Sequence, residues 1–191
     1  MNAIRSSRWT LLTAVGLGLG LLGGLLVGFP LGQIVNAMIV TGAVTCVVGA
    51  ILGGMQSIEL RRLPVKPIWW ILATIAGLGA GLAAGVVVIE QVGILLTGTR
   101  PNVARLDSSM RALSFVVLGL VAGTLLGAAQ SLALRKRAPR IKRWTATTGV
   151  GLAIAFAGGS LLVDLASLRI ASLFGVITFV VVSGIAFGAI T

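Results

Sequence analysis

Long apolar stretches alternate with short polar or basic connections along the whole chain. A helix needs roughly 20 apolar residues to cross a hydrocarbon core of about 30 Å. Six stretches meet that length, so the pattern predicts an all-α integral membrane protein with six transmembrane helices. The predicted helices lie, to within several residues, near 9–29, 34–58, 68–95, 111–134, 144–165 and 170–190.

Three similar units follow one another through these stretches. Each begins with a tryptophan that stands seven residues before a glycine, and each later reaches a G-x-x-x-G motif. Gln56 and Gln130 follow that motif in the first two units, whereas Thr191 holds the place in the third. An internal repeat of this kind predicts one membrane domain of three tandem two-helix hairpins. The tryptophans are Trp9, Trp70 and Trp144, and the units cover about 9–62, 68–137 and 144–191.

The middle unit is longer than the other two. Trp70 and Gln130 are 60 residues apart, whereas Trp9 and Gln56 are 47 apart. We expect the extra residues in the polar connection Leu96–Ser109. Because each unit has an even number of spans, all three share one orientation, and a rough three-fold axis along the membrane normal should relate them.

Composition and charge place the chain in a membrane and orient it there. With 57% hydrophobic residues, 10% charged residues and a mean hydropathy of +1.10, a soluble domain could not cover its surface. Eleven of the 15 basic residues fall at the N-terminus and in the two connections between units. The positive-inside rule then predicts a multi-pass cell (inner) membrane protein with both termini cytoplasmic. All four tryptophans start odd-numbered helices on that side, as rings in the headgroup layer would.

Rows of glycines four residues apart give the helices flat faces that admit another backbone. Such a face could pack within the six-helix bundle, contact a second copy, or line a substrate path. The even-numbered helices carry these rows at Gly49, Gly53, Gly119, Gly123, Gly127, Gly184 and Gly188.

Gln56 and Gln130 are the most specific polar candidates, since each opens a Q-S-x-x-L motif followed by two basic residues. A primary amide at the membrane boundary must find hydrogen-bond partners. It could form an interhelical bond that fixes its hairpin, or serve as a polar gate or ligand contact at the cytoplasmic mouth. Without a glutamine at Thr191, no complete three-fold ring of amides is expected.

Glu90 and Asp164 are interpreted as the only acidic residues near a membrane-embedded end. Each could anchor its helix at the interface, with Arg111 or Arg169 as partner, or belong to an ion or proton site. Intramembrane charges mark pumps and ion-coupled carriers, and no charged residue falls at a predicted bilayer centre. The pattern therefore argues against such activity.

A basic run lies between the second and third units, and its first role is to set topology. It also attracts anionic headgroups, by about 1 kcal/mol per charge. The net charge of +11 would suggest nucleic acid in a soluble protein, but here phospholipid is the simpler partner. The lipid-headgroup candidates are Arg135, Lys136, Arg137, Arg140, Lys142 and Arg143.

The chain shows no catalytic, metal-binding or cofactor-binding motif, so no enzyme and no cofactor are expected. The pattern of tryptophan, glycine-rich helix and G-x-x-x-G-x-x-Q-x-x-x-L-R resembles a group of uncharacterised small multi-pass membrane proteins of bacteria. The resemblance implies no activity, and it covers Trp9 to Arg61, Trp70 to Arg135 and Trp144 to Gly188.

The leading interpretation is a non-enzymatic structural or accessory membrane protein. It would pack through its glycine faces with itself or with a larger membrane complex. The alternative is a small passive transporter or channel with a path along the pseudo-three-fold axis. A continuous polar cavity would favour transport, and a dry, closed axis would favour the accessory role. The third unit lacks the basic residues that follow the two glutamines, as a truncated unit would.

Overall fold

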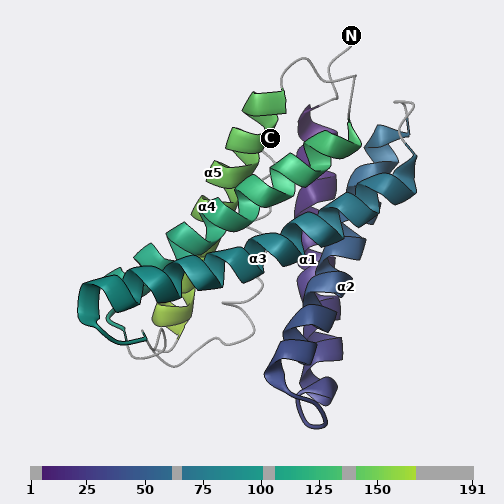
Figure 1. Ribbon diagram of the computed structural model, residues 1–191. Coiled ribbons are helices and arrows are strands. Elements are labelled where there is room, and N and C mark those ends of the chain that lie inside the picture. The colour runs from purple at the N-terminus through teal and green to yellow at the C-terminus, as the bar shows by residue number, and fades with distance from the viewer. Residues whose placement is uncertain (1–5, 62–65, 101–105, 135–140, 167–191) are drawn as a thin grey trace.

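The computed structural model describes residues 6–61, 66–100, 106–134 and 141–166, and these residues form five α-helices (Figure 1). Four of the helices, α1 to α4, are long and apolar enough to cross a membrane. The described part is therefore all-α, with the helices of a multi-pass membrane protein. The helices are α1 (Ser6–Leu31), α2 (Ala37–Leu60), α3 (Pro67–Thr97), α4 (Ser108–Ala133) and α5 (Ile141–Ala166).

Five of the six predicted helices are confirmed, and their ends lie within three residues of the predicted ones. Apolar length decided these positions, because a bilayer-spanning run leaves few alternatives to a helix. The sixth predicted helix, near 170–190, lies outside the described residues.

Local signals set several of the helix ends. Asn36 begins α2, where its side-chain oxygen accepts a 3.0 Å hydrogen bond from the Ile39 N–H. Asp107 caps α4 in the same way, through a 2.8 Å bond from the Met110 N–H. Gly98 ends α3 in the left-handed conformation, with φ of 71°, and its N–H donates to the Ile94 carbonyl.

The expected loop insertion is in part a longer helix. Helices α1 and α3 both begin three residues before their tryptophan, but α1 has 26 residues and α3 has 31. The apolar run of α3 continues through Leu96, and no breaker precedes Gly98. The extra residues are therefore shared among α3, the connection and the start of α4, rather than confined to Leu96–Ser109 as predicted.

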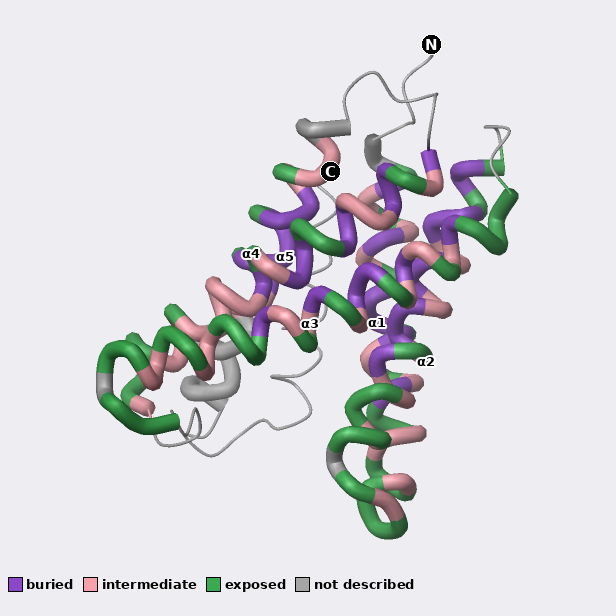
Figure 2. Tube along the Cα trace, in the orientation of Figure 1, coloured by how far each residue is buried: buried purple, intermediate pink, exposed green. Residues whose placement is uncertain are grey.

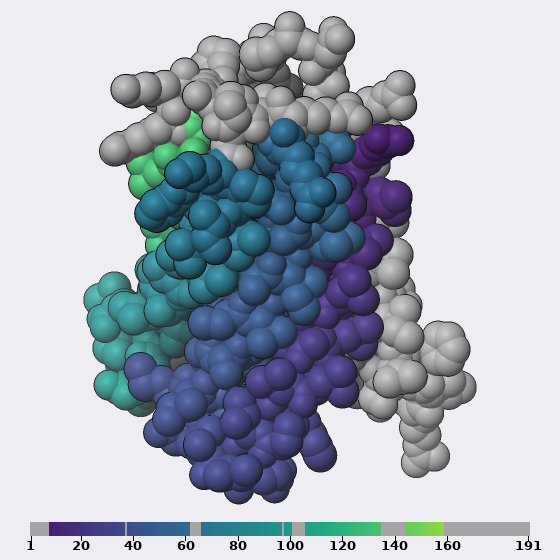
Figure 3. Space-filling view, turned by 90° about the vertical axis from the view of Figure 1, so that its right-hand side faces the viewer, coloured from purple at the N-terminus to yellow at the C-terminus, as the bar shows by residue number. Residues whose placement is uncertain are grey.

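Each described helix packs against its neighbour in chain order, and glycines allow the backbones to meet. Within the first pair, a Cβ added to Gly20 of α1 would lie 3.1 Å from the Val48 Cα of α2. The pair α3–α4 repeats this contact, since a Cβ on Gly81 would lie 2.6 Å from the Ala122 Cα. In the space-filling view of Figure 3, the surfaces of α1, α2 and α3 lie side by side.

Glycines of the even helices make the contacts between pairs. A Cβ on Gly49 of α2 would lie 2.9 Å from the Ile75 Cα of α3. On α4, a Cβ on Gly123 would lie 2.7 Å from the Gly149 Cα of α5. Gly53, Gly119 and Gly127 lie equally close to the following helix, whereas Gly184 and Gly188 are outside the described residues.

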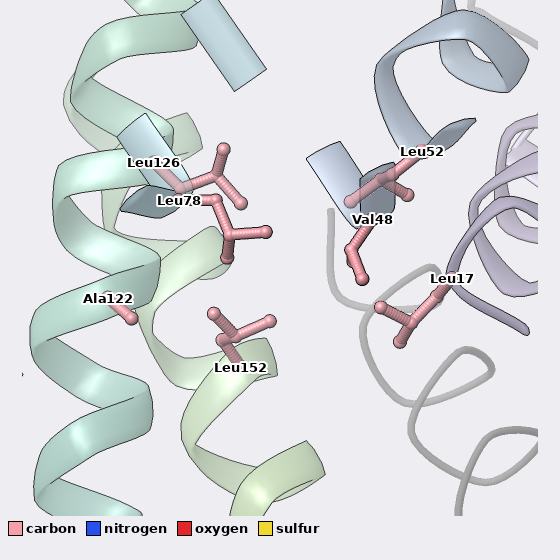
Figure 4. Close-up of a cluster of buried hydrophobic side chains, with 7 residues drawn as sticks. All are labelled: Leu17, Val48, Leu52, Leu78, Ala122, Leu126 and Leu152. Atoms are coloured by element: carbon pink, nitrogen blue, oxygen red, sulfur yellow. The ribbon is translucent and has the colours of Figure 1, made fainter. Parts of the chain in front are cut away.

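Burial is concentrated toward the end of the bundle where α1 begins, called here the tryptophan end because it holds Trp9, Trp70 and Trp144 (Figure 2). Trp9 and Trp70 form a cluster there with Leu60 and Leu134. A second cluster lies deeper, where side chains from all five helices point toward one another (Figure 4). Its members are Leu17, Val48, Leu52, Leu78, Ala122, Leu126 and Leu152.

A tryptophan, glutamine and threonine network as the candidate functional site

The odd-numbered helices each present the same three side chains to the interior at spacings of four residues. Such spacing places them on one helix face, one turn apart. A tryptophan comes first, a threonine with 0% exposure follows, and a buried leucine completes the row. The rows are Trp9, Thr13 and Leu17 on α1, Trp70, Thr74 and Leu78 on α3, and Trp144, Thr148 and Leu152 on α5.

Helices α2 and α4 each place a buried glutamine between two leucines, one four residues before it and one four residues after it. Gln56 of α2 and Gln130 of α4 are both fully buried, at 0% exposure. The flanking leucines are Leu52 and Leu60 on α2 and Leu126 and Leu134 on α4. The interior is therefore layered, with an aromatic layer at the tryptophan end, then a layer of amides and hydroxyls, then a leucine layer.

The three tryptophan rings contact one another edge to face. The ring centroids of Trp9 and Trp70 are 6.1 Å apart, as are those of Trp70 and Trp144. Trp9 and Trp144 are closest, at 5.4 Å. The interplanar angles of 68° to 74° are the edge-to-face geometry that aromatic quadrupoles favour. The trio therefore closes the tryptophan end of the interior.

Gln56 joins three helices through its amide. Its Nε2 donates to the Thr13 hydroxyl of α1 at 3.3 Å. Its Oε1 accepts from the Trp70 indole N–H of α3 at 3.2 Å, and also from the Gln130 Nε2 of α4. The N–H donor and the carbonyl acceptor of the Gln56 amide therefore bond to different helices, and the side chain is fully buried.

Gln130 makes the corresponding set of bonds one hairpin later. Its Nε2 donates to the Thr74 hydroxyl of α3 at 3.2 Å and to the Gln56 Oε1 at 3.2 Å. Its Oε1 accepts from the Trp144 indole N–H of α5 at 3.3 Å. Each glutamine therefore donates to the threonine of the preceding helix and accepts from the tryptophan of the following one.

Hydroxyls in and beside the network also donate to carbonyls of their own helices. Thr74 and Thr148 each donate to the carbonyl of the tryptophan four residues earlier, at 2.9 Å. Ser57 donates to the Gly54 carbonyl and Ser131 to the Ala128 carbonyl, at 2.7 and 2.8 Å. These bonds satisfy buried hydroxyls without a second helix, which an apolar environment demands.

The chemistry of this network is that of neutral hydrogen bonding. Indoles, amides and hydroxyls do not titrate near neutral pH, and a hydroxyl without an adjacent base is a weak nucleophile. The described residues contain no group of three or more His, Cys, Asp or Glu side chains that could hold a metal ion. What the arrangement does directly is to hold five helices together at one level.

The other predicted site residues lie away from the network. Glu90 is half-buried in α3, 20 residues after Trp70, and Asp164 belongs to the last turns of α5. Lys142 and Arg143 belong to the first turn of α5. The preceding basic residues, Arg135, Lys136, Arg137 and Arg140, lie outside the described residues.

Two sequence-based interpretations need correction. Glu90 and Asp164 are not the only acidic residues at embedded helix ends, because α2 continues to Leu60 and so includes Glu59, which is only 7% exposed. The tryptophans do not all face headgroups, since Trp69 alone is exposed, at 61%, while Trp9 and Trp70 are buried. An indole N–H with a buried acceptor is more stable inside than a general interfacial preference suggests.

Sequence reasoning also missed Thr13, Thr74 and Thr148. The signal was present, because a threonine stands four residues after the tryptophan of every unit. Comparison of the chain with protein-family models, with curated proteins and with solved structures found no match.

Proposed function

We propose that this protein is a non-enzymatic structural or accessory membrane component whose helical hairpins are locked together by the tryptophan, glutamine and threonine network. The observation that carries the proposal is that Gln56 and Gln130 bond to four side chains on three other helices and to each other. Because the donors and acceptors of the network hydrogen-bond to one another, the network favours a fixed helix assembly over a ligand-binding site.

The layering of the interior supports the same proposal over a passive transporter or channel. The amide layer lies between the tryptophan trio and the leucines around Leu52 and Leu126. A solute moving along the axis would have to displace aromatic rings, break the hydrogen bonds of both glutamines and then cross an apolar layer. A filled axis of this kind is what a structural role requires.

The architecture belongs to the proposal as well: six spans in three hairpins, related by a pseudo-three-fold axis. Matching contacts support it, because Gly20 and Gly81 touch their partner helices at corresponding positions, as do Gly49 and Gly123. In the same proposal the protein lies in the inner membrane, with both termini on the cytoplasmic side. Arg8, Arg61 and Lys66 are exposed at the tryptophan end, where anionic headgroups would hold them.

The glycine contacts also narrow how the protein could associate with a partner. The rows at Gly49, Gly53, Gly119, Gly123 and Gly127 are occupied by neighbouring helices of the same chain. A second copy or another membrane complex would therefore dock on other faces, which carry apolar side chains such as Leu26 and Leu95. Lipid fills those faces in the absence of a partner.

The test is solute flux through purified protein in sealed proteoliposomes, with a panel of ions, sugars, amino acids and small neutral solutes. We expect no flux above that of protein-free vesicles. The control is a Gln56→Ala and Gln130→Ala variant, which opens the amide layer while keeping the helices apolar. Saturable flux by the wild-type protein that the double variant alters would overturn the structural role in favour of transport.

A further inference from the structure

The contacts between α1 and α2 define the register of this antiparallel pair. The Thr13 hydroxyl of α1 accepts a hydrogen bond from the Gln56 Nε2 of α2, and a Cβ on Gly20 would lie 3.1 Å from the Val48 Cα. Seven residues forward on α1 thus correspond to eight residues back on α2. Residues equally far from Thr13 and from Gln56, in opposite directions along the chain, therefore lie at about the same level.

Arg8 and Arg61 share one level at the tryptophan end, because each is five residues away, Arg8 from Thr13 and Arg61 from Gln56. Both side chains are exposed, and neither makes an ion pair or a side-chain hydrogen bond in the described part of the chain. The acidic residue nearest to Arg61 in sequence, Glu59, is only 7% exposed and lies about 200° away around α2. Two unpaired cations at one level repel each other, so the arrangement favours an anion beside them.

An apolar surface runs along both helices from this pair of arginines toward the middle of the bundle. On α1, Leu11 and Val15 follow the arginine by three and seven residues and are 62% and 39% exposed. On α2, Ile58 and Gly54 precede the arginine by the same two spacings. Ile58 is 45% exposed, and a Cβ on Gly54 would meet no heavy atom within 4 Å. Residues three, four and seven apart share a helix face, so each arginine stands at the head of an exposed apolar strip.

The length of this surface matches one leaflet of a bilayer. Seven helical residues rise about 10 Å, and half of a hydrocarbon core of about 30 Å is about 15 Å. By the register of the pair, Val15 lies level with Gly54, so the open space at Gly54 is within the depth that an acyl chain reaches below its headgroup. Both helices lie at the surface in Figure 3.

We propose that Arg8 and Arg61 together bind the phosphate of one anionic phospholipid, whose acyl chain lies along Val15, Ile58 and the open position at Gly54. Guanidinium groups suit this role, since their planar donors bind phosphate oxygens in pairs. A zwitterionic lipid is a poorer occupant, because its own cationic headgroup repels the two arginines. The inference needs only that the first hairpin spans a bilayer, and it does not rest on the structural role proposed above.

The test is native mass spectrometry of the full-length protein released from nanodiscs that contain equal amounts of phosphatidylglycerol and phosphatidylcholine with identical acyl chains. We expect one phosphatidylglycerol per chain to be retained. Two basic contacts at a membrane surface correspond to roughly a 30-fold preference over phosphatidylcholine. An Arg8→Gln and Arg61→Gln double variant should lose that preference, whereas Arg100→Gln should keep it. Arg100 is the matched control because it is an exposed arginine at the end of α3 away from the tryptophans.

The acyl-chain half of the site has its own pair of variants. Gly54→Leu fills the open position without changing the charge, and it should reduce phosphatidylglycerol retention. Gly42→Leu is the matched control, because a Cβ at Gly42 also meets no heavy atom within 4 Å but lies 19 residues from Arg61. Added phosphatidylglycerol should raise the melting temperature in detergent for the wild-type protein and for Gly42→Leu, and less for the other two variants.

Three outcomes would overturn the proposal. One is retention of the two lipids in equal amounts, or of neither, by the wild-type protein. Another is a loss of preference in Arg100→Gln as large as in the double variant, which would show that net charge alone attracts the lipid. The third is unchanged retention in Gly54→Leu, which would place the acyl chain elsewhere. Solute flux tests the structural role separately, since a transporter would bind the same lipid.

Discussion

The Gln130 Nε2 donates a 3.2 Å hydrogen bond to the Gln56 Oε1, although the two residues are 74 positions apart in the chain. The bond crosses the bundle from α4 to α2, two helices that each pack mainly on their own neighbours. It links the first hairpin to the second through side chains alone. The following predictions test what this link and its surroundings contribute.

Replacing Gln130 by leucine should destabilise the protein. The change removes bonds to Gln56 and Thr74 and leaves the Trp144 indole N–H without its acceptor. We expect a loss of about 1–2 kcal/mol, the upper range for interhelical hydrogen bonds in membranes. Denaturant titration in mild detergent measures it. Ser131→Ala is the matched control and should change little, because Ser131 bonds only within α4. Equal stability of both variants would contradict the locking role.

Trp70→Phe should be more costly than Trp69→Phe. Trp70 is fully buried and donates to Gln56, whereas Trp69 is 61% exposed. Phenylalanine keeps an aromatic ring but loses the N–H. We expect Trp70→Phe to lower the melting temperature and to weaken the split circular dichroism band expected of three contacting indoles, because only the Trp9–Trp144 pair remains. An unchanged band in Trp70→Phe, or its loss in Trp69→Phe, would show that a different set of rings is in contact.

Gly123→Ala and Gly123→Leu should both disrupt the α4–α5 contact, the leucine more severely. A Cβ at Gly123 would lie 2.5 Å from the Thr148 carbonyl oxygen and 2.7 Å from the Gly149 Cα, both backbone atoms that cannot rotate away. Overpacking of this kind costs typically about 1–3 kcal/mol. The expected result is poor yield or loss of the compact species on size-exclusion chromatography.

Gly42→Ala is the control for that experiment, because a Cβ at Gly42 would meet no heavy atom within 4 Å. It should be neutral or slightly stabilising, since alanine favours helix by about 1 kcal/mol over glycine. If Gly123→Leu proved as well tolerated as Gly42→Ala, the described α4–α5 contact would be wrong.

Membrane topology can be checked with fused reporters. A reporter placed after Arg62 or after Arg140 should be cytoplasmic, and one inserted near Asn102 should be external. The reason is the excess of basic residues in the connections between units. Substituting the basic residues of the Arg135–Arg143 run should weaken this preference without changing the helices. The reverse pattern, or an odd number of crossings, would exclude the proposed six-span arrangement.

The helices could be read from the sequence because their length and hydropathy leave one viable structure in a bilayer. The end of α2 was harder, since Glu59 looks like a boundary residue but continues the helix into Leu60. The predicted end of α3 lies two residues before the observed one, because Thr97 still belongs to the helix and Gly98 ends it.

The site was only partly predictable. The spacing of Gln56 and Gln130 marked them as polar side chains in need of partners, but spacing within a helix says nothing about which helix supplies them. The partners lie on separate hairpins, and bundle geometry decides that choice. The general preference of tryptophan for membrane interfaces predicts that Trp70 faces the headgroup layer. Its indole N–H instead donates to Gln56, and the ring is buried in the bundle.

The network also constrains the order in which the chain can mature during synthesis. The Thr13 hydroxyl is already in the membrane when Gln56 arrives, so the first bond can form within a single hairpin. The Gln56 carbonyl oxygen must wait for Trp70, 14 residues later, and for Gln130, 74 residues later. The first hairpin therefore inserts with an acceptor still open near the membrane surface, and each hairpin that follows completes the one before it.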